Sequence, residues 1–279
     1  MTSEITEIDY YDLLESKEVL SDSLLEKIGK GFGNFDDSLG IIIVKNIPDF
    51  QDLRQKLLRL SHQLATCTPK ETLDELTIAN ANYQVGWSHG QERVEGEDKF
   101  DTAKGSYYAN PLSDDVLSYI LERDFPSASP NEEDDSVNMK KFNGTKEEFI
   151  EIAKENPAFF ASNVWPVTLP ELEQSFKQMG LLIRTIGKLV GNLCDEYVLK
   201  GCPEYTPNKI NEIIDKSMCC KGRLLHYFPM NSDPSDVVEE SSNKNDIPFS
   251  DWCGWHNDHV SQTFKALFNS FFFCNHVTK

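Results

Sequence analysis

Basic residues are scarce in this sequence, and so are histidines, cysteines and long apolar runs. Lys and Arg together number 27 against 46 Asp and Glu, which gives a formal net charge of −19 at pH 7. Such a chain is repelled by nucleic-acid phosphates and by anionic lipid, so neither is an expected partner. No apolar run of about 18 residues, the length of a membrane helix, occurs. The first residues also lack the basic and apolar regions of a secretion signal, and we expect a protein that is not exported.

The seven cysteines are odd in number and scattered, apart from the neighbours Cys219 and Cys220. A disulfide framework is therefore not expected, and reduced thiols in the cytoplasm are the better interpretation. The remaining composition, 39% hydrophobic and 11% aromatic, is ordinary for a globular protein with a real core.

Two segments have the apolar spacing of amphipathic helices. These are residues 49–67 and 168–200, where apolar side chains recur every three or four residues. We expect shorter helices after Ser21 or Ser23, after a capping box at Thr145, and over 207–216. The long helix is expected to pack against a sheet, with a coiled coil as the alternative. Its apolar positions are Leu172, Phe176, Met179, Ile183, Ile186, Val190, Leu193 and Tyr197.

Strands are expected between these helices. Residues 40–48 form a β-branched run bounded by Gly and Pro, which is typical of a strand buried on both faces. Further predicted strands are residues 5–13, 83–87, 106–110 and 221–229, with a loop joining 83–87 to 106–110. The acidic, polar segment 124–147 is interpreted as a solvated insertion.

A polar loop over 231–246 leads to the motif His256-Asn257-Asp258. Side chains two residues apart point to the same side of an extended strand, so this imidazole and carboxylate can face one cavity. They supply two ligands of the 2-His-1-carboxylate arrangement that holds Fe(II) in non-haem oxygenases. A His-x-Asp tripeptide is a weak signal in an acidic chain with six histidines, and its context carries the interpretation.

In order along the chain, four segments resemble the isopenicillin N synthase-like branch of the 2-oxoglutarate and Fe(II)-dependent dioxygenases. They are residues 40–47, Leu169-Pro170-Glu171 at the start of the long helix, residues 223–229, and residues 254–259. The resemblance implies an α/β (α+β) fold, with a helical N-terminal region before a partial double-stranded β-helix, or jelly roll. It also implies Fe(II) bound by His256 and Asp258, with 2-oxoglutarate as cosubstrate. The candidate cosubstrate contacts are Arg223 and Tyr227, and a structural salt bridge is the alternative role for Arg223.

The sequence departs from the family pattern in several places. Phe228 stands where a tyrosine commonly faces the cosubstrate, His226 replaces the usual asparagine, and Val260 replaces a glycine. The chain ends 21 residues after Asp258, before the family's distal histidine and arginine. We therefore expect a C-terminally truncated chain that is inactive as it stands, divided into residues 1–220, 221–259 and a non-family tail, 260–279. The tail has the composition of translated intron, which the spliced transcript would test.

Other ligand sets remain open. His276 could complete the iron site, and a zinc site could combine Cys253, His256 and His259 with Cys219 or Cys220. His89 is interpreted as a loop histidine that could touch substrate, and Trp252 and Trp255 as core or cavity-lining residues. The function expected of the full-length form is oxidation of a small organic substrate. The alternative is a non-catalytic oxygenase-fold module.

Overall fold

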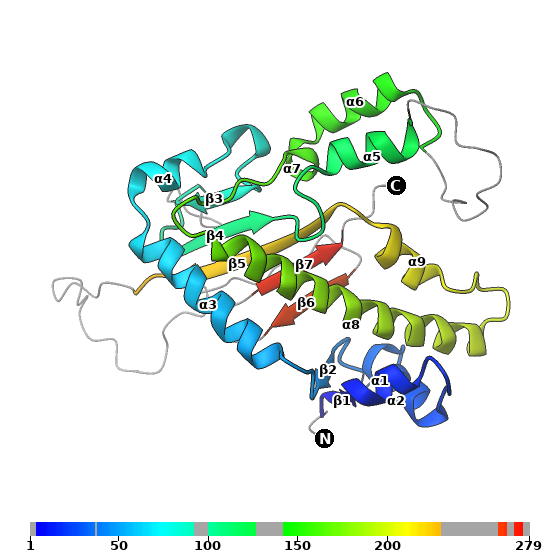
Figure 1. The fold of residues 1–279 in the computed structure, drawn as a ribbon. Coiled ribbons are helices and arrows are strands. Elements are labelled where there is room, and N and C mark those ends of the chain that lie inside the picture. Colours follow the sequence, from blue (N-terminus) through cyan, green and yellow to red (C-terminus); the bar gives the residue numbers. More distant parts are fainter. Residues whose placement is uncertain are drawn as a thin grey trace, which may run out of the picture.

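The computed structural model describes residues 4–36, 38–91, 100–126 and 142–229, and the backbone alone of 262–266 and 271–275. Helices and strands are mixed along the chain (Figure 1). In chain order the elements are β1 (Thr6–Asp9), α1 (Tyr10–Glu15), α2 (Asp22–Phe32), β2 (Ile42–Lys45), α3 (Phe50–Cys67), α4 (Lys70–Glu75), the 3-10 turn η1 (Ala79–Ala81), β3 (Gly86–His89), β4 (Lys104–Ala109), α5 (Val116–Asp124), α6 (Lys146–Glu155), α7 (Pro157–Phe160), α8 (Glu171–Gly201), α9 (Lys209–Lys216), β5 (Cys220–Tyr227), β6 (Gln262–Ala266) and β7 (Phe271–Asn275).

The centre of the fold is an antiparallel sheet of five strands in the order β3-β4-β5-β7-β6. The expected strands at 83–87, 106–110 and 221–229 are confirmed with boundaries shifted by a few residues. This sheet takes strands from all three ranges into which the sequence was divided. The division itself stays a prediction.

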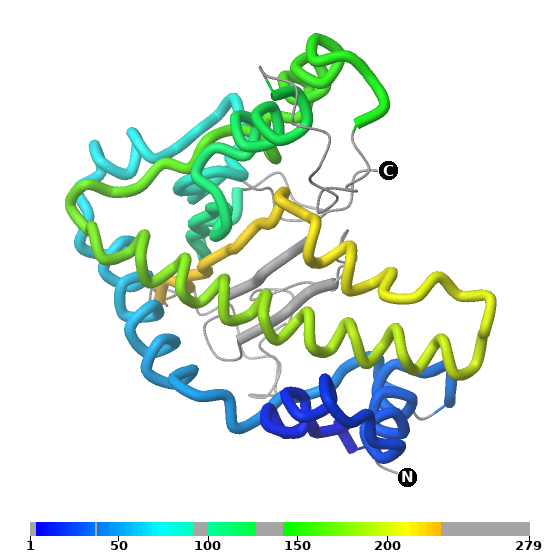
Figure 2. The backbone as a smooth tube through the Cα atoms, turned by 45° about the vertical axis from the view of Figure 1, so that its right-hand side comes forward, coloured from blue at the N-terminus to red at the C-terminus, as the bar shows by residue number. Residues whose placement is uncertain are grey.

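Helices α3 and α8 cover one face of this sheet, as Figures 1 and 2 show from two directions. Their apolar stripes meet the side chains of Tyr107 on β4 and Leu224 on β5, both 1% exposed. This packing confirms that the long helix lies against a sheet, because its first half supplies part of the same core. The helix residues in that core are Leu57, Leu60, Leu64, Leu172, Phe176, Met179 and Ile183.

The second half of α8 packs on an N-terminal unit made of α1, α2 and the parallel pair β1-β2. The predicted burial of residues 40–48 on both faces is wrong. Residues Ile42 to Val44 are half-buried, Lys45 is exposed, and Ile41 is 46% exposed. The helices of this unit cover only part of the two-stranded sheet. Helix α2 approaches it closely at Gly31, which lies beside the side chain of Ile42. The predicted strand 5–13 also ends early, at Asp9, which caps α1.

The helix expected after Thr145 is confirmed as α6. Its capping box is complete, since Thr145 Oγ1 accepts from the Glu148 amide while Glu148 accepts from the Thr145 amide. It packs with α5 and α7 around Phe149 and Phe160.

The mixed helical and sheet fold is consistent with the expected α/β class. The two facing sheets of a double-stranded β-helix are not seen within the described ranges, where one five-stranded and one two-stranded sheet occur. None of the helices in these ranges combines the length and apolarity needed to cross a membrane.

Candidate functional site

The two faces of β5 have different surroundings. Leu224 lies in the core beneath α3 and α8, so alternation along the strand places Arg223, Leu225 and Tyr227 on the opposite face. The structure thus brings the two predicted cosubstrate contacts, Arg223 and Tyr227, onto the same face. That face is turned away from the two long helices.

Arg223 is held there by residues of β4. Its Nε and Nη2 atoms donate to the hydroxyl of Ser106, at 3.1 and 2.8 Å, and its Cζ atom lies 5.1 Å from the centre of the Tyr108 ring. Ser106 is 3% exposed and Tyr108 is 8% exposed. A planar guanidinium clamped by a hydroxyl and an aromatic ring has a fixed orientation, which lowers the entropic cost of binding an anion. Ser106 and Tyr108 are among the residues that contact the Arg223 guanidinium. The alternative role of Arg223 in a structural salt bridge stays a prediction.

Tyr227 is half-buried and pairs with Lys104 across the strands. Four residues of extended chain separate its Cα from that of Arg223 by about 13 Å. The two side chains can therefore contact opposite ends of a ligand, or two ligands, and not one small group.

A second group of rings lies on the helix side of β5. The His226 ring is centred 5.4 Å from that of His62 on α3 and 4.8 Å from that of Phe228. Phe228 in turn lies 4.7 Å from His89, whose Nε2 is 3.0 Å from the carbonyl oxygen of Thr102. His89 is the last residue of β3, so its expected place in a loop is wrong. Sequence reasoning also missed His62, which lies among exposed positions of α3.

Gly105 makes room for this cluster. A Cβ atom there would lie 2.4 Å from the Trp87 ring and 3.2 Å from the Phe228 ring. Burial of His226 lowers its pKa, with a further lowering from the neighbouring His62. The His226 imidazole is therefore neutral at physiological pH.

The predicted iron ligands His256 and Asp258 lie outside the described residues. So do the alternatives His259, His276 and Cys253, and so do Trp252 and Trp255. Within the described ranges, no group of three or more His, Cys, Asp or Glu side chains is arranged to hold a metal ion.

The cysteines available for the alternative zinc site have raised pKa values. Burial raises the pKa of Cys220 to about 12 and also raises that of Cys219. The other residues of that zinc site lie outside the described ranges, so the zinc alternative stays a prediction.

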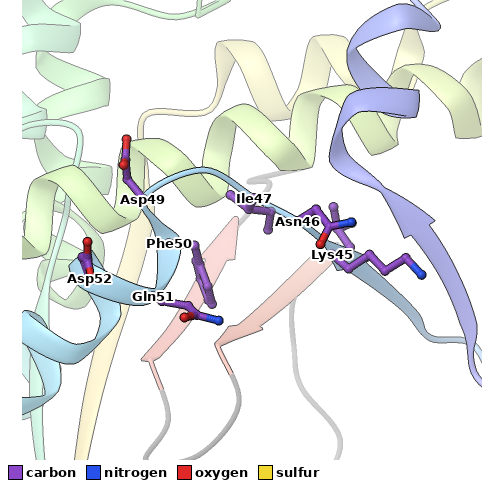
Figure 3. A pocket seen from close by; sticks show the side chains of 8 residues that line it. Lys45, Asn46, Ile47, Asp49, Phe50, Gln51 and Asp52 are labelled. Atoms are coloured by element: carbon purple, nitrogen blue, oxygen red, sulfur yellow. The ribbon is translucent and has the colours of Figure 1, made fainter.

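A groove of about 580 Å³ lies at the junction of β2 and α3. Figure 3 shows Asp49 pointing away from the side to which Phe50 points. Two polar side chains that line the groove contact residues of β1. Lys45 forms an ion pair with Glu7 at 3.0 Å, and the Asn46 amide donates a hydrogen bond to Asp9 at 2.5 Å. These contacts anchor the segment between β2 and α3 to β1.

No protein-family model matches the chain, and no curated protein matches it. One solved structure to which the chain is similar is a protein from Caulobacter crescentus, described as a candidate member of the 2OG-Fe(II) oxygenase family. It is 15% identical, with a TM-score of 0.49, and the likeness covers 82% of this chain and 58% of that one. The chain thus spans less than two thirds of its neighbour's length. A likeness this distant does not assign a family.

Proposed function

We propose that this chain is a non-haem Fe(II) and 2-oxoglutarate-dependent oxygenase-like protein whose reaction oxidises a small organic substrate. The observation that carries the proposal is the Arg223 guanidinium, fixed by the Ser106 hydroxyl on the sheet face turned away from the helices. A guanidinium beside a hydroxyl is a donor set suited to a carboxylate. Tyr227, on the same face, is the second proposed contact.

The proposed metal ligands are His256 and Asp258. A neutral imidazole with a carboxylate two residues away suits Fe(II) and leaves coordination positions for a cosubstrate. When bound, iron supplies the oxidising chemistry. The residues of the chain bind and orient: Arg223 holds the carboxylate of 2-oxoglutarate, Ser106 fixes Arg223, and the core beneath α3 and α8 keeps β4 and β5 rigid.

The second candidate is a non-catalytic oxygenase-fold module. Phe228 favours it, because this residue stands where the resembling family commonly has a tyrosine that faces the cosubstrate. In this structure its ring packs with His89 and His226 on the helix side of β5, away from Arg223.

Succinate formation from 2-oxoglutarate, measured with the whole chain, Fe(II) and a reductant, distinguishes the two candidates. The oxygenase proposal expects succinate, its loss in His256→Ala, and a KM for 2-oxoglutarate raised by roughly tenfold or more in Arg223→Gln. Arg184→Gln is the matched control, since Arg184 pairs with Asp215 away from the sheet face. Absence of succinate from the unaltered chain would support the non-catalytic module. An unchanged KM in Arg223→Gln would refute the carboxylate site.

A further inference from the structure

His62 and His226 are brought together although 163 residues lie between them in the sequence. His62 is on α3 and is exposed, while His226 is near the end of β5 and is half-buried. Helix α3 lies across β5 in Figure 1, and Leu57 and Leu64 on the helix fix it there by packing into the same core as Leu224. The relative position of the two rings is thus set by the core and not by flexible loops.

The separation of the rings matches that of two imidazoles sharing one metal ion. A Zn–N bond is about 2.1 Å long and a coordinating nitrogen lies about 1.1 Å from its ring centre, so tetrahedral binding places two ring centres about 5.2 Å apart. The observed separation is 5.4 Å, with the ring planes inclined by 53°.

One nitrogen of this pair lacks a partner. His226 Nε2 is buried and, within the described part of the chain, makes no hydrogen bond. Buried polar atoms are nearly always satisfied, and an unsatisfied one points to a missing water or ion.

We propose that His62 and His226 form a two-histidine site for a divalent transition metal such as Zn²⁺, Ni²⁺ or Cu²⁺. These ions favour imidazole nitrogen, whereas Mg²⁺ and Ca²⁺ favour oxygen. The exposed side of His62 leaves the remaining coordination positions to water or to a small ligand. This site lies on the helix side of β5, opposite Arg223, and does not depend on the proposed oxygenase function.

The test measures Zn²⁺ binding by equilibrium dialysis and the visible spectrum of bound Co²⁺. The whole chain carries His256→Ala and Asp258→Ala, so the ligands proposed for iron do not contribute. We expect one equivalent of metal in this background. Adding His62→Ala should weaken binding by roughly tenfold or more, because one of two protein ligands is lost. His62 is exposed, so this substitution leaves the core intact.

Two further variants complete the test. His226→Phe should weaken binding to the same extent as His62→Ala, and the circular dichroism spectrum and melting temperature check that it folds. His89→Ala is the matched control, because His89 belongs to the same ring cluster but its Nε2 already faces the Thr102 carbonyl. It should leave affinity unchanged. No metal bound in the starting background, or binding that survives His62→Ala, would overturn the proposal.

Discussion

Tyr205 donates its phenolic hydrogen to Asp195 Oδ1 at 2.5 Å. Asp195 is 2% exposed and lies on α8. The same carboxylate accepts from the backbone amides of Ile210 and Asn211, at 2.8 and 2.9 Å, in the first turn of α9. The N-cap residue of α9, Asn208, makes no capping bond with its own side chain. One helix therefore caps the next, and Tyr205 secures the loop between them.

Replacing Asp195 by alanine should lower the free energy of unfolding by about 3 kcal/mol, because three donors lose a charged acceptor. Tyr205→Phe removes one donor and keeps the ring, so it should cost about 1.5 kcal/mol. Urea unfolding of the two variants and the unaltered chain checks the difference. Equal losses would show that the helix cap contributes nothing beyond the tyrosine.

The same contact makes stability depend on pH in the alkaline range. Burial and the hydrogen bond to Asp195 raise the pKa of Tyr205 from 10.0 to about 12. The unfolded tyrosine loses its proton first as pH rises, so the stabilisation is complete below pH 10.0 and is lost as pH approaches 12. Unfolding measured in this window should show a smaller decline for Tyr205→Phe than for the unaltered chain. Parallel declines would contradict the assignment.

Alanine substitutions at two glycines with positive φ can distinguish the cost of backbone strain from the cost of a steric clash. Gly86 has φ +72, and an added Cβ would lie 2.0 Å from the Leu76 carbonyl oxygen. Gly40 has φ +67 and nothing within 4 Å of an added Cβ. Gly86→Ala should therefore cost about 3 kcal/mol and Gly40→Ala about 1 kcal/mol. Thermal unfolding gives the comparison, and equal costs would mean that strain alone matters.

The long helix was predictable because its signal is local. Each apolar residue of α8 is placed by its neighbours three and four positions away, whatever the partner. What it packs against was only partly predictable: its first half lies on the sheet, as expected, while its second half contacts the N-terminal unit. Buried Asp195 breaks the apolar pattern, and its role depends on donors 10, 15 and 16 residues later.

The candidate site was less predictable because its contacts join distant parts of the chain. Arg223 was identified, but its partner Ser106 is 117 residues earlier. The helix pattern does not distinguish His62 from the other exposed residues of α3. Its closeness to His226 follows only from the packing of α3 across β5. Strand pairing brings these residues together, and the sequence pattern does not specify which strands pair.

The partner of Arg223 provides a test of the proposed cosubstrate site. Ser106→Ala removes the hydroxyl that orients the guanidinium, and should raise the KM for 2-oxoglutarate by about tenfold while leaving turnover at saturation unchanged. Ser88→Ala is the matched control: Ser88 is also buried and pairs with Ser106 on the neighbouring strand. Steady-state succinate formation gives both constants. Equal changes in the two variants would indicate a general loss of packing.

The contact between His62 and His226 should also be visible in metal-free protein, in the titration of His226. Burial and the charge of His62 both lower the pKa of His226 below 6.5. His62→Gln removes the charge and keeps a polar side chain, so the titration midpoint of His226 should move upward but stay below 6.5, since burial remains. Proton NMR of the imidazole resonances follows the midpoint, with His89→Gln as the control. Because the pKa of His226 is lowered in the folded state, its contribution to stability is fully present above pH 6.5 and is lost as pH falls through the folded-state midpoint. A midpoint at or above 6.5 in the unaltered chain would place His226 in contact with water and contradict its burial.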